Sequence, residues 1–271
     1  MGQKSKAQQA AEMRRHQENL RAEALKKQKK QERLVWQIII GALALVLILV
    51  VGSLAITSAL DKKAENDRNK QNENAPKMED LDMTEISLSD YANTDDVTDL
   101  VRMNITYTDE NGVEKTGDVV IRLYKAVAPI TVENFQKLVK DGFYDELTFH
   151  RITTASDGIY VLQGGDPEGT GMGGSTPIKG EMTNNGFTNN LSHVRGVISM
   201  ARKGGSYDSG SSQFFIMYED STVLDKEYAS FGFVVYGMDT VDAISKTELQ
   251  SNGSTPASPV TINYATFVKA S

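Results

Sequence analysis

Two polar residues, Arg151 and Gln163, lie in short stretches that are typical of neighbouring β-strands. Arg151 is part of FHRI (residues 149–152), and Gln163 opens QGGDP (163–167). An arginine beside a glutamine and apolar residues is an unusual pair. The guanidinium of the arginine is always charged, and its N–H groups can donate hydrogen bonds in a fixed geometry next to an apolar surface. Taken alone, Arg151 would also fit an ion-paired charge at a strand edge.

Two other patterns suggest chemistry that their context does not support. GTGMGG (169–174) has the G-x-G-x-x-G spacing of a dinucleotide-binding loop, but Ser-Thr-Pro follows where a helix should open. A flexible or tightly turned loop is the simpler interpretation. A hydrolase would need His150 or His193 as the base for one of the serines at 206, 209, 211 and 212. No G-x-S-x-G motif surrounds those serines.

The composition narrows the remaining possibilities. The 271 residues include no cysteine, which excludes disulfides, thiolate metal sites and a cysteine nucleophile. The three histidines are scattered, and Asp166, Glu168 and Glu181 lack the alternating spacing of a site for hard cations. The sequence therefore predicts neither a metal nor a cofactor.

The charge is divided unevenly along the chain. The net charge is −7, but residues 1–33 carry ten Lys or Arg against four Asp or Glu, so they contribute +6 and residues 34–271 contribute −13. Residues 34–60 contain no charged residue, and 21 of these 27 residues are apolar. About 20 apolar residues in a helix cross a bilayer, and the few polar residues here form no stripe. Residues 34–60 are predicted to be a single transmembrane helix.

The basic flank predicts the orientation in the cell membrane. Lys and Arg are enriched on the cytoplasmic side, so residues 1–33 are predicted to be a cytoplasmic tail and the acidic part to lie on the extracytoplasmic side. A signal peptide cleaved near Ser53-Leu54-Ala55 is the alternative. Signal peptides, however, have apolar cores of only about 7–15 residues, which is shorter than this stretch. Residues 61–95, rich in Asn, Glu, Asp and Lys, are predicted to be a polar flexible linker. No nucleic-acid partner is expected, because the basic tail has no aromatic residue before Trp36.

From residue 96 onward, short apolar runs alternate with glycine-rich turns. Asn111-Gly112 separates two alternating runs, which is a strong hairpin signal. Further strands are expected at 147–152, 159–163, 196–201, 213–218, 230–235 and 260–268, and helices at 132–140, capped by Thr131, and 240–246. Many antiparallel strands with two helices predict a mainly β domain, a closed or nearly closed barrel capped by helices.

Six motifs in this region resemble those of the cyclophilin family of peptidyl-prolyl cis/trans isomerases. They are FHRI (149–152), QGGDPEGTGMGG (163–174), IKGEM (178–182), GVISMAR (196–202), SSQFFIM (211–217) and FGFVVYGMD (231–239). The resemblance implies an eight-stranded antiparallel barrel closed by two helices at residues 96–271. Together with the predicted membrane span, it suggests a membrane-anchored bacterial member of the family.

The resemblance also implies a role for individual residues. Arg151 is the catalytic arginine, and Gln163 orients it or the substrate carbonyl. The other residues bind substrate: Phe215 and Leu224 as pocket walls, Gln213 as a polar contact, and Ala201 with Arg202 as the edge whose backbone pairs with the peptide.

Several pocket positions depart from the family pattern. They are Tyr160 and Val161 in place of Phe-Met, Arg202 in place of Asn, Val223 in place of Trp and Tyr228 in place of His. The smaller side chains at 161 and 223 predict a shallower pocket, weaker substrate binding and weak inhibition by cyclosporin-type ligands.

These residues predict an isomerase that acts on proline-containing unfolded or exported polypeptides. X–Pro bonds interconvert over tens of seconds, slowly enough to limit folding. In the twisted amide the proline nitrogen regains a lone pair, and a guanidinium that donates to it binds the transition state better than either planar isomer. The acidic outer domain suits basic or neutral clients. The alternative is a non-catalytic, chaperone-like module whose groove binds proline-containing segments without turnover.

Overall fold

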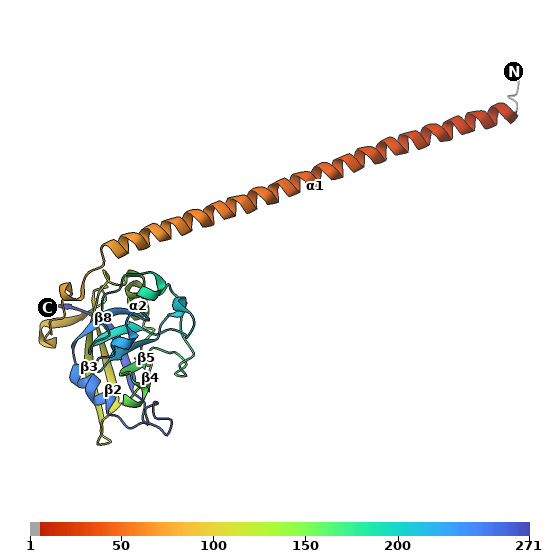
Figure 1. The fold of residues 1–271 in the computed structure, drawn as a ribbon. Helices are drawn as coiled ribbons and strands as arrows, with labels where there is room; N and C mark the ends of the chain where they lie inside the picture. Colours follow the sequence, from red (N-terminus) through yellow and green to blue (C-terminus); the bar gives the residue numbers. More distant parts are fainter. Residues whose placement is uncertain (1–5) are drawn as a thin grey trace. The chain divides into compact units, whose positions relative to one another are not determined.

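A computed structural model describes residues 6–271, without some of the side chains between residues 6 and 48 (Figure 1). The chain divides into two units, Met1–Asp67 and Arg68–Ser271. Helix α1 (Lys6–Glu73) makes up the described part of the first unit, and its last residues belong to the second. The second unit contains α2 (Pro129–Lys140), α3 (Met238–Ser245) and the strands β1 (Tyr91–Thr94), β2 (Leu100–Thr108), β3 (Glu114–Leu123), β4 (Phe149–Ile152), β5 (Val161–Gly164), β6 (Val197–Met200), β7 (Phe214–Met217), β8 (Ala229–Tyr236) and β9 (Thr261–Ala270).

The predicted membrane span at 34–60 lies within α1. In the described part of the chain, no helix is both long and apolar enough to cross a bilayer. Residues 38, 40, 43–45, 47 and 48 of the predicted span, all Ile, Leu or Ala, lie outside the residues whose side chains are described.

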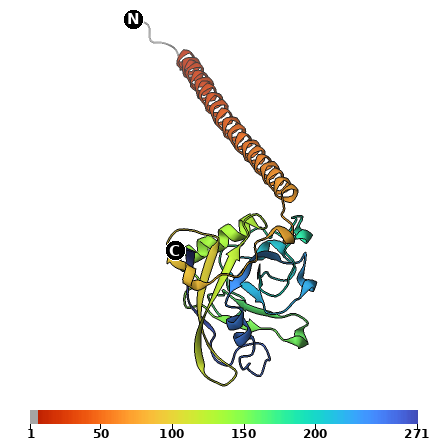
Figure 2. The same ribbon diagram turned by 90° about the vertical axis from the view of Figure 1, so that its left-hand side faces the viewer.

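Nine strands of the second unit form one antiparallel sheet in the order β1-β9-β2-β3-β8-β6-β7-β5-β4. The predicted count of eight is therefore wrong, because β1 adds a strand from within the predicted linker and pairs with the end of β9. The sheet is not closed by a continuous ladder. β4 meets β9 through the isolated bridge Thr148–Thr261 and neighbouring backbone hydrogen bonds. The helices α2 and α3 lie at opposite ends of this open barrel (Figures 1 and 2).

The core forms where the inward faces of the strands meet α2. The predicted hairpin at Asn111-Gly112 is confirmed and joins β2 to β3. The predicted apolar face of α2 is also confirmed, since Phe135, Leu138 and Val139 are buried. The ring of Phe135 lies 5.6 Å from that of Phe214 in β7, which ties α2 to the strands that carry the site.

The start of α2 differs from the prediction that Thr131 caps it. Pro129 occupies the first helical position and Ala128 precedes it, so the helix begins two residues before Thr131. A proline at this position has its φ already set for a helix and has no N–H to leave unpaired. The capping carboxylate comes from Glu181, whose Oε2 accepts hydrogen bonds from the backbone N–H of Thr131 at 2.8 Å and from its hydroxyl at 2.9 Å.

The structure of residues 61–95 differs from the predicted flexible linker. α1 continues through its first part to Glu73. Five apolar residues between Glu73 and β1 pack against the core clusters of the second unit: Met78, Leu81, Met83, Ile86 and Leu88. The backbone carbonyl of Asp82 also accepts hydrogen bonds from the hydroxyl of Tyr124 at 2.7 Å and from Arg122 at 3.0 Å. These residues recur at steps of three and two positions, which matches neither the period of a helix nor that of a strand.

Candidate active site

Arg151 and Gln163 face each other across paired strands. The register of β4 and β5 sets them opposite one another, and Nη1 of Arg151 donates a hydrogen bond to Oε1 of Gln163 at 3.2 Å. Arg151 is half-buried. None of the arginine ion pairs in the described part of the chain involves it. Arg151 is therefore not an ion-paired strand-edge charge, and its other N–H groups can donate to a ligand.

Gln163 extends this contact into a chain of hydrogen bonds. Its Nε2 donates to Oε1 of Gln213 at 2.8 Å, and Nε2 of Gln213 donates to the carbonyl oxygen of Gly173 at 2.9 Å. A guanidinium only donates, so it fixes which end of the Gln163 amide faces Arg151 and, through that amide, the orientation of Gln213. The chain thus runs in one direction from Arg151 to the glycine-rich loop.

Phe215 provides an aromatic surface next to these polar groups. It lies opposite Gln163 in the pairing of β5 and β7, and the residue is only 4% exposed. The ring of His193 stacks on it at 6.0 Å between centroids, and the ring of Tyr228 meets it edge-on at 5.4 Å. The predicted pocket residues Phe215 and Tyr228 therefore come together, and both rings lie next to that of His193, which the pocket prediction left out.

The other predicted wall residues differ in their placement. Val161 is buried and lies two residues from Gln163, on the same face of β5. Tyr160 and Leu224 are half-buried. Val223 is 71% exposed and does not form a wall of this cluster, because it and Leu224 lie in a 3₁₀ turn that directs adjacent side chains differently.

Arg202 holds the edge of the site together and is not free to act as a second cationic donor. Its guanidinium carbon lies 4.8 Å from the ring centroid of Tyr207 and 4.9 Å from that of Tyr228. Nη2 pairs with a carboxylate oxygen of Glu227 at 2.7 Å, and Nε donates to the Glu227 carbonyl. With its side chain 10% exposed, Arg202 fixes the Tyr228 ring.

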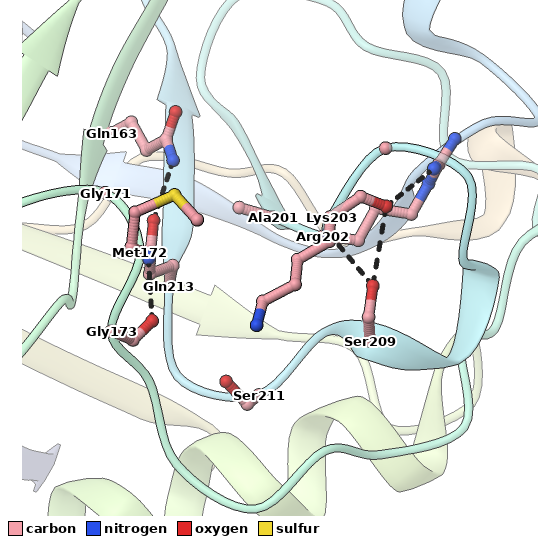
Figure 3. Close-up of a pocket in the computed structure, with 11 residues that line it drawn as sticks. Gln163, Gly171, Met172, Gly173, Ala201, Arg202, Lys203, Ser209, Ser211 and Gln213 are labelled. Carbon is pink, nitrogen blue, oxygen red and sulfur yellow. Dashed lines mark hydrogen bonds between the residues drawn. The ribbon is translucent and has the colours of Figure 1, made fainter.

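A cavity of about 270 Å³ opens beside the two glutamines (Figure 3). Figure 3 shows the Lys203 side chain reaching across it from the segment that also carries Ala201. The lining residues are Gln163, Gly171, Met172, Gly173, Ala201, Arg202, Lys203, Gly204, Ser209, Ser211 and Gln213. The cavity therefore joins the polar chain of the site to the predicted peptide-binding edge.

The glycine-rich loop that borders the cavity is wrapped around Asp166. Its carboxylate accepts hydrogen bonds from the backbone N–H groups of Glu168, Thr170, Gly171 and Gly173 at 2.6–3.2 Å. Burial raises the pKa of Asp166, but these hydrogen bonds outweigh it and the pKa is lowered overall. The donors that a nucleotide phosphate would need are occupied, which is why the G-x-G-x-x-G spacing here does not indicate a nucleotide site.

One Ser–His–Asp arrangement is present among the described residues, and it uses none of the serines at 206, 209, 211 and 212. His193 Nδ1 lies 2.8 Å from Oδ1 of Asp225, and Nε2 lies 2.8 Å from Oγ of Ser199. Ser199 is 0% exposed, so a substrate cannot reach its oxygen and the arrangement is not a hydrolase site. Burial lowers the pKa of His193 by more than Asp225 raises it, so the ring is neutral at pH 7. No local motif joins these residues, so the arrangement could not be predicted from the sequence.

A half-buried arginine without a carboxylate partner among the described residues, next to an aromatic wall, suits a reaction that breaks no covalent bond. Residues 105–267 match the family model described as cyclophilin type peptidyl-prolyl cis-trans isomerase. The chain belongs to this family, whose members catalyse peptidyl-prolyl cis-trans isomerisation.

Individual relatives agree with this assignment. The chain is 36% identical over 152 residues to peptidyl-prolyl cis-trans isomerase CYP18-1 of Arabidopsis thaliana, covering 56% of this chain and 90% of the relative. It is 40% identical over 138 residues to peptidyl-prolyl cis-trans isomerase B of Bacillus subtilis, covering 51% and 90%. A crystal structure of a cyclophilin-type isomerase from Cryptosporidium parvum, determined in the presence of the dipeptide Ala-Pro, matches with a TM-score of 0.50 and 26% identity over 60% of this chain and 98% of that one.

Proposed function

We propose that Arg151 catalyses X–Pro isomerisation by donating a hydrogen bond to the proline nitrogen of the twisted amide. The barrier to rotation, about 18–20 kcal/mol, exists because the nitrogen lone pair is delocalised into the carbonyl group. The lone pair becomes available as the amide twists, so a donor in this position stabilises the transition state more than either planar isomer. The observation that carries the proposal is the unpaired Arg151 guanidinium held by Gln163 beside the Phe215 ring.

Arg151 cannot supply the whole rate enhancement. Shortening the exchange time from tens of seconds to about a millisecond requires roughly 10⁴-fold, or about 5.5 kcal/mol. A hydrogen bond from a charged donor contributes about 1.5–3 kcal/mol. The remainder comes from holding the proline ring against Phe215, Tyr228 and Leu224 while the carbonyl side rotates. Gln163 keeps the guanidinium aimed at the nitrogen.

Isomerisation of an Ala-Pro peptide by the full-length chain and by Arg151→Ala tests this mechanism. We expect the variant to lose most of the rate while it still binds the peptide, since Phe215 and Tyr228 remain. A wild-type chain that binds the peptide without accelerating its isomerisation would instead support a non-catalytic binding module. Equal rates for both proteins would contradict the role of Arg151.

We also propose that residues 34–60 anchor the enzyme in a cell membrane, with the N-terminus cytoplasmic and the isomerase domain on the extracytoplasmic side. The support is the charge-free stretch of 27 residues and its basic N-terminal flank. The clients would then be unfolded or newly exported proline-containing chains. Protease treatment of intact cells is expected to remove the C-terminal domain. A protected domain, or a chain recovered in the soluble fraction after lysis, would contradict the anchor or its orientation.

A further inference from the structure

The side chain of His193 is enclosed between two hydrogen-bonding partners. The residue is 1% exposed, with Oδ1 of Asp225 at 2.8 Å from Nδ1 and Oγ of Ser199 at 2.8 Å from Nε2. The other carboxylate oxygen of Asp225 accepts the hydroxyl of Ser192 at 2.6 Å, and Oδ1 also accepts the backbone N–H of His193 at 2.7 Å. Every polar atom of the imidazole therefore has a partner.

These contacts select one tautomer of the ring. An ionised carboxylate only accepts hydrogen bonds, so Nδ1 of His193 carries the proton and donates it to Asp225. Nε2 of the neutral ring is then the acceptor, and the hydroxyl of Ser199 donates to it. Asp225 thus sets both the rotation of the ring about its bond to the backbone and the direction of the hydrogen bond on its far side.

The same histidine is connected to three residues of the predicted pocket: Phe215, Leu224 and Tyr160. Its ring stacks on Phe215. Its backbone carbonyl accepts the N–H of Ser221 at 2.8 Å, and the carbonyl of Ser221 accepts the N–H of Leu224 at 3.0 Å. The hydroxyl of Ser221 accepts the N–H of Tyr160 at 3.1 Å. A turned His193 ring would lose its contact with Phe215 and its hydrogen bond to Asp225, which directly follows Leu224 in the same loop.

We propose that Asp225 and His193 are positioning residues for the isomerase, in which the carboxylate fixes the imidazole and the imidazole fixes the proline-binding surface. This inference rests on the proposed function of the site. It assigns the Ser199–His193–Asp225 arrangement a task that needs no access to Ser199: the arrangement holds Phe215 and the loop at residues 221–225 in the geometry that grips a proline ring.

Three variants of the full-length chain separate positioning from general stability. Asp225→Ala removes the acceptor of Nδ1. Asp225→Asn can still present an oxygen to Nδ1 and to the His193 N–H while its amide group donates to Ser192. Glu219→Ala is a matched control, because Glu219 is an exposed acidic residue near the same loop. Should Asp225→Ala not fold, Asp225→Ser takes its place, since that side chain is too short to reach the ring.

For Asp225→Ala we expect kcat/KM for an Ala-Pro peptide to fall roughly tenfold, mostly through KM, as for the loss of one hydrogen bond to a charged group. In ¹⁵N spectra of the ring nitrogens, the signal of the Nδ1–H tautomer of His193 is expected in wild type and Asp225→Asn and lost in Asp225→Ala. Asp225→Asn should recover most of the activity, and Glu219→Ala should match wild type.

Wild-type kcat and KM in a folded Asp225→Ala with an altered His193 tautomer would overturn the inference. Equal losses in Asp225→Asn and Asp225→Ala, with the tautomer kept only in the former, would overturn it as well. These results are distinguishable from failure of the proposed function. Failure of the proposed function would appear as a wild-type chain without isomerase activity. Failure of this inference alone would leave the wild-type chain active and Arg151→Ala slower.

Discussion

Replacing Asp166 by alanine is expected to loosen the loop at residues 166–174 and to lower the stability of the second unit. One carboxylate, 1% exposed, accepts four backbone N–H groups of this loop. Hydrogen bonds to a charged group contribute about 1.5–3 kcal/mol each. The four are not additive, because most of the loop is exposed and its freed N–H groups can bind water. We therefore expect a loss of about 3 kcal/mol.

Thermal and urea unfolding of the full-length chain measure this loss. A change of about 3 kcal/mol corresponds to a fall in Tm of roughly 6–12 °C for a domain of this size. Asp166→Asn keeps one acceptor oxygen and should lose less. Glu168→Ala is the matched control in the same loop, and its Tm should stay within about 2 °C of wild type. Equal Tm values for Asp166→Ala and Glu168→Ala would refute the reasoning.

The pH dependence gives an independent check on the same carboxylate. The pKa of Asp166 in the folded chain is lowered, because the loop N–H groups outweigh the effect of burial. Its contribution to stability is therefore full above its unfolded pKa, near pH 4, and is lost as the pH falls through the lower folded value. The difference in unfolding free energy between wild type and Asp166→Asn should shrink below about pH 4. A difference that stays constant there would contradict this assignment.

Three further predictions follow from the contacts of the second unit. A chain that starts at residue 95 should have a lower Tm than one that starts at residue 68, because it lacks the apolar residues at positions 78–88 that pack against the core. Equal Tm values for the two chains would contradict a stabilising role of these residues. Burial raises the pKa of Glu181 in the folded chain, so the stability of wild type declines as the pH rises through that folded-state pKa. In urea unfolding at pH 7, Glu181→Gln should therefore be at least as stable as wild type. Glu181→Ala should lose about 1–3 kcal/mol, because it leaves the hydrogen-bond donors without an acceptor. Lys203 lines the cavity, so Lys203→Glu should lower kcat/KM for peptides with Glu near the proline relative to peptides with Lys there, by up to about fivefold. An unchanged ratio of the two kcat/KM values would exclude Lys203 as a determinant of peptide preference.

The strands and the predicted site pair were accessible from the sequence because their signals are local. Alternating apolar residues predicted β2 and β3, and Asn111-Gly112 predicted their hairpin. Arg151 and Gln163 lie in strands that the apolar runs predicted, and the structure joins their side chains. β1 was missed because it is four residues long and Tyr91 is its only large apolar residue.

The features that the sequence did not reveal depend on contacts between distant residues. Glu181 caps a helix that begins 52 residues earlier in the chain, while the nearby Thr131 suggested a cap of its own. His193 and Asp225 are 32 residues apart, and no G-x-S-x-G motif surrounds Ser199. The Asp166 loop did leave a signal. A buried aspartate followed by a run of glycines, whose N–H groups can all turn inwards, predicts a carboxylate-centred loop as well as a phosphate site.

We propose that a directed guanidinium, and not positive charge alone, lowers the barrier to amide rotation. Arg151→Lys tests it most directly, since lysine keeps the charge and loses the fixed fork of donors. With a saturating Ala-Pro peptide, NMR exchange spectroscopy measures the cis–trans rate constant on the full-length enzyme. We predict a fall of about tenfold or more with Kd within about twofold of wild type, as expected for the loss of one hydrogen bond made mainly in the transition state. A lysine variant that isomerises the bound peptide at the wild-type rate would contradict the claim.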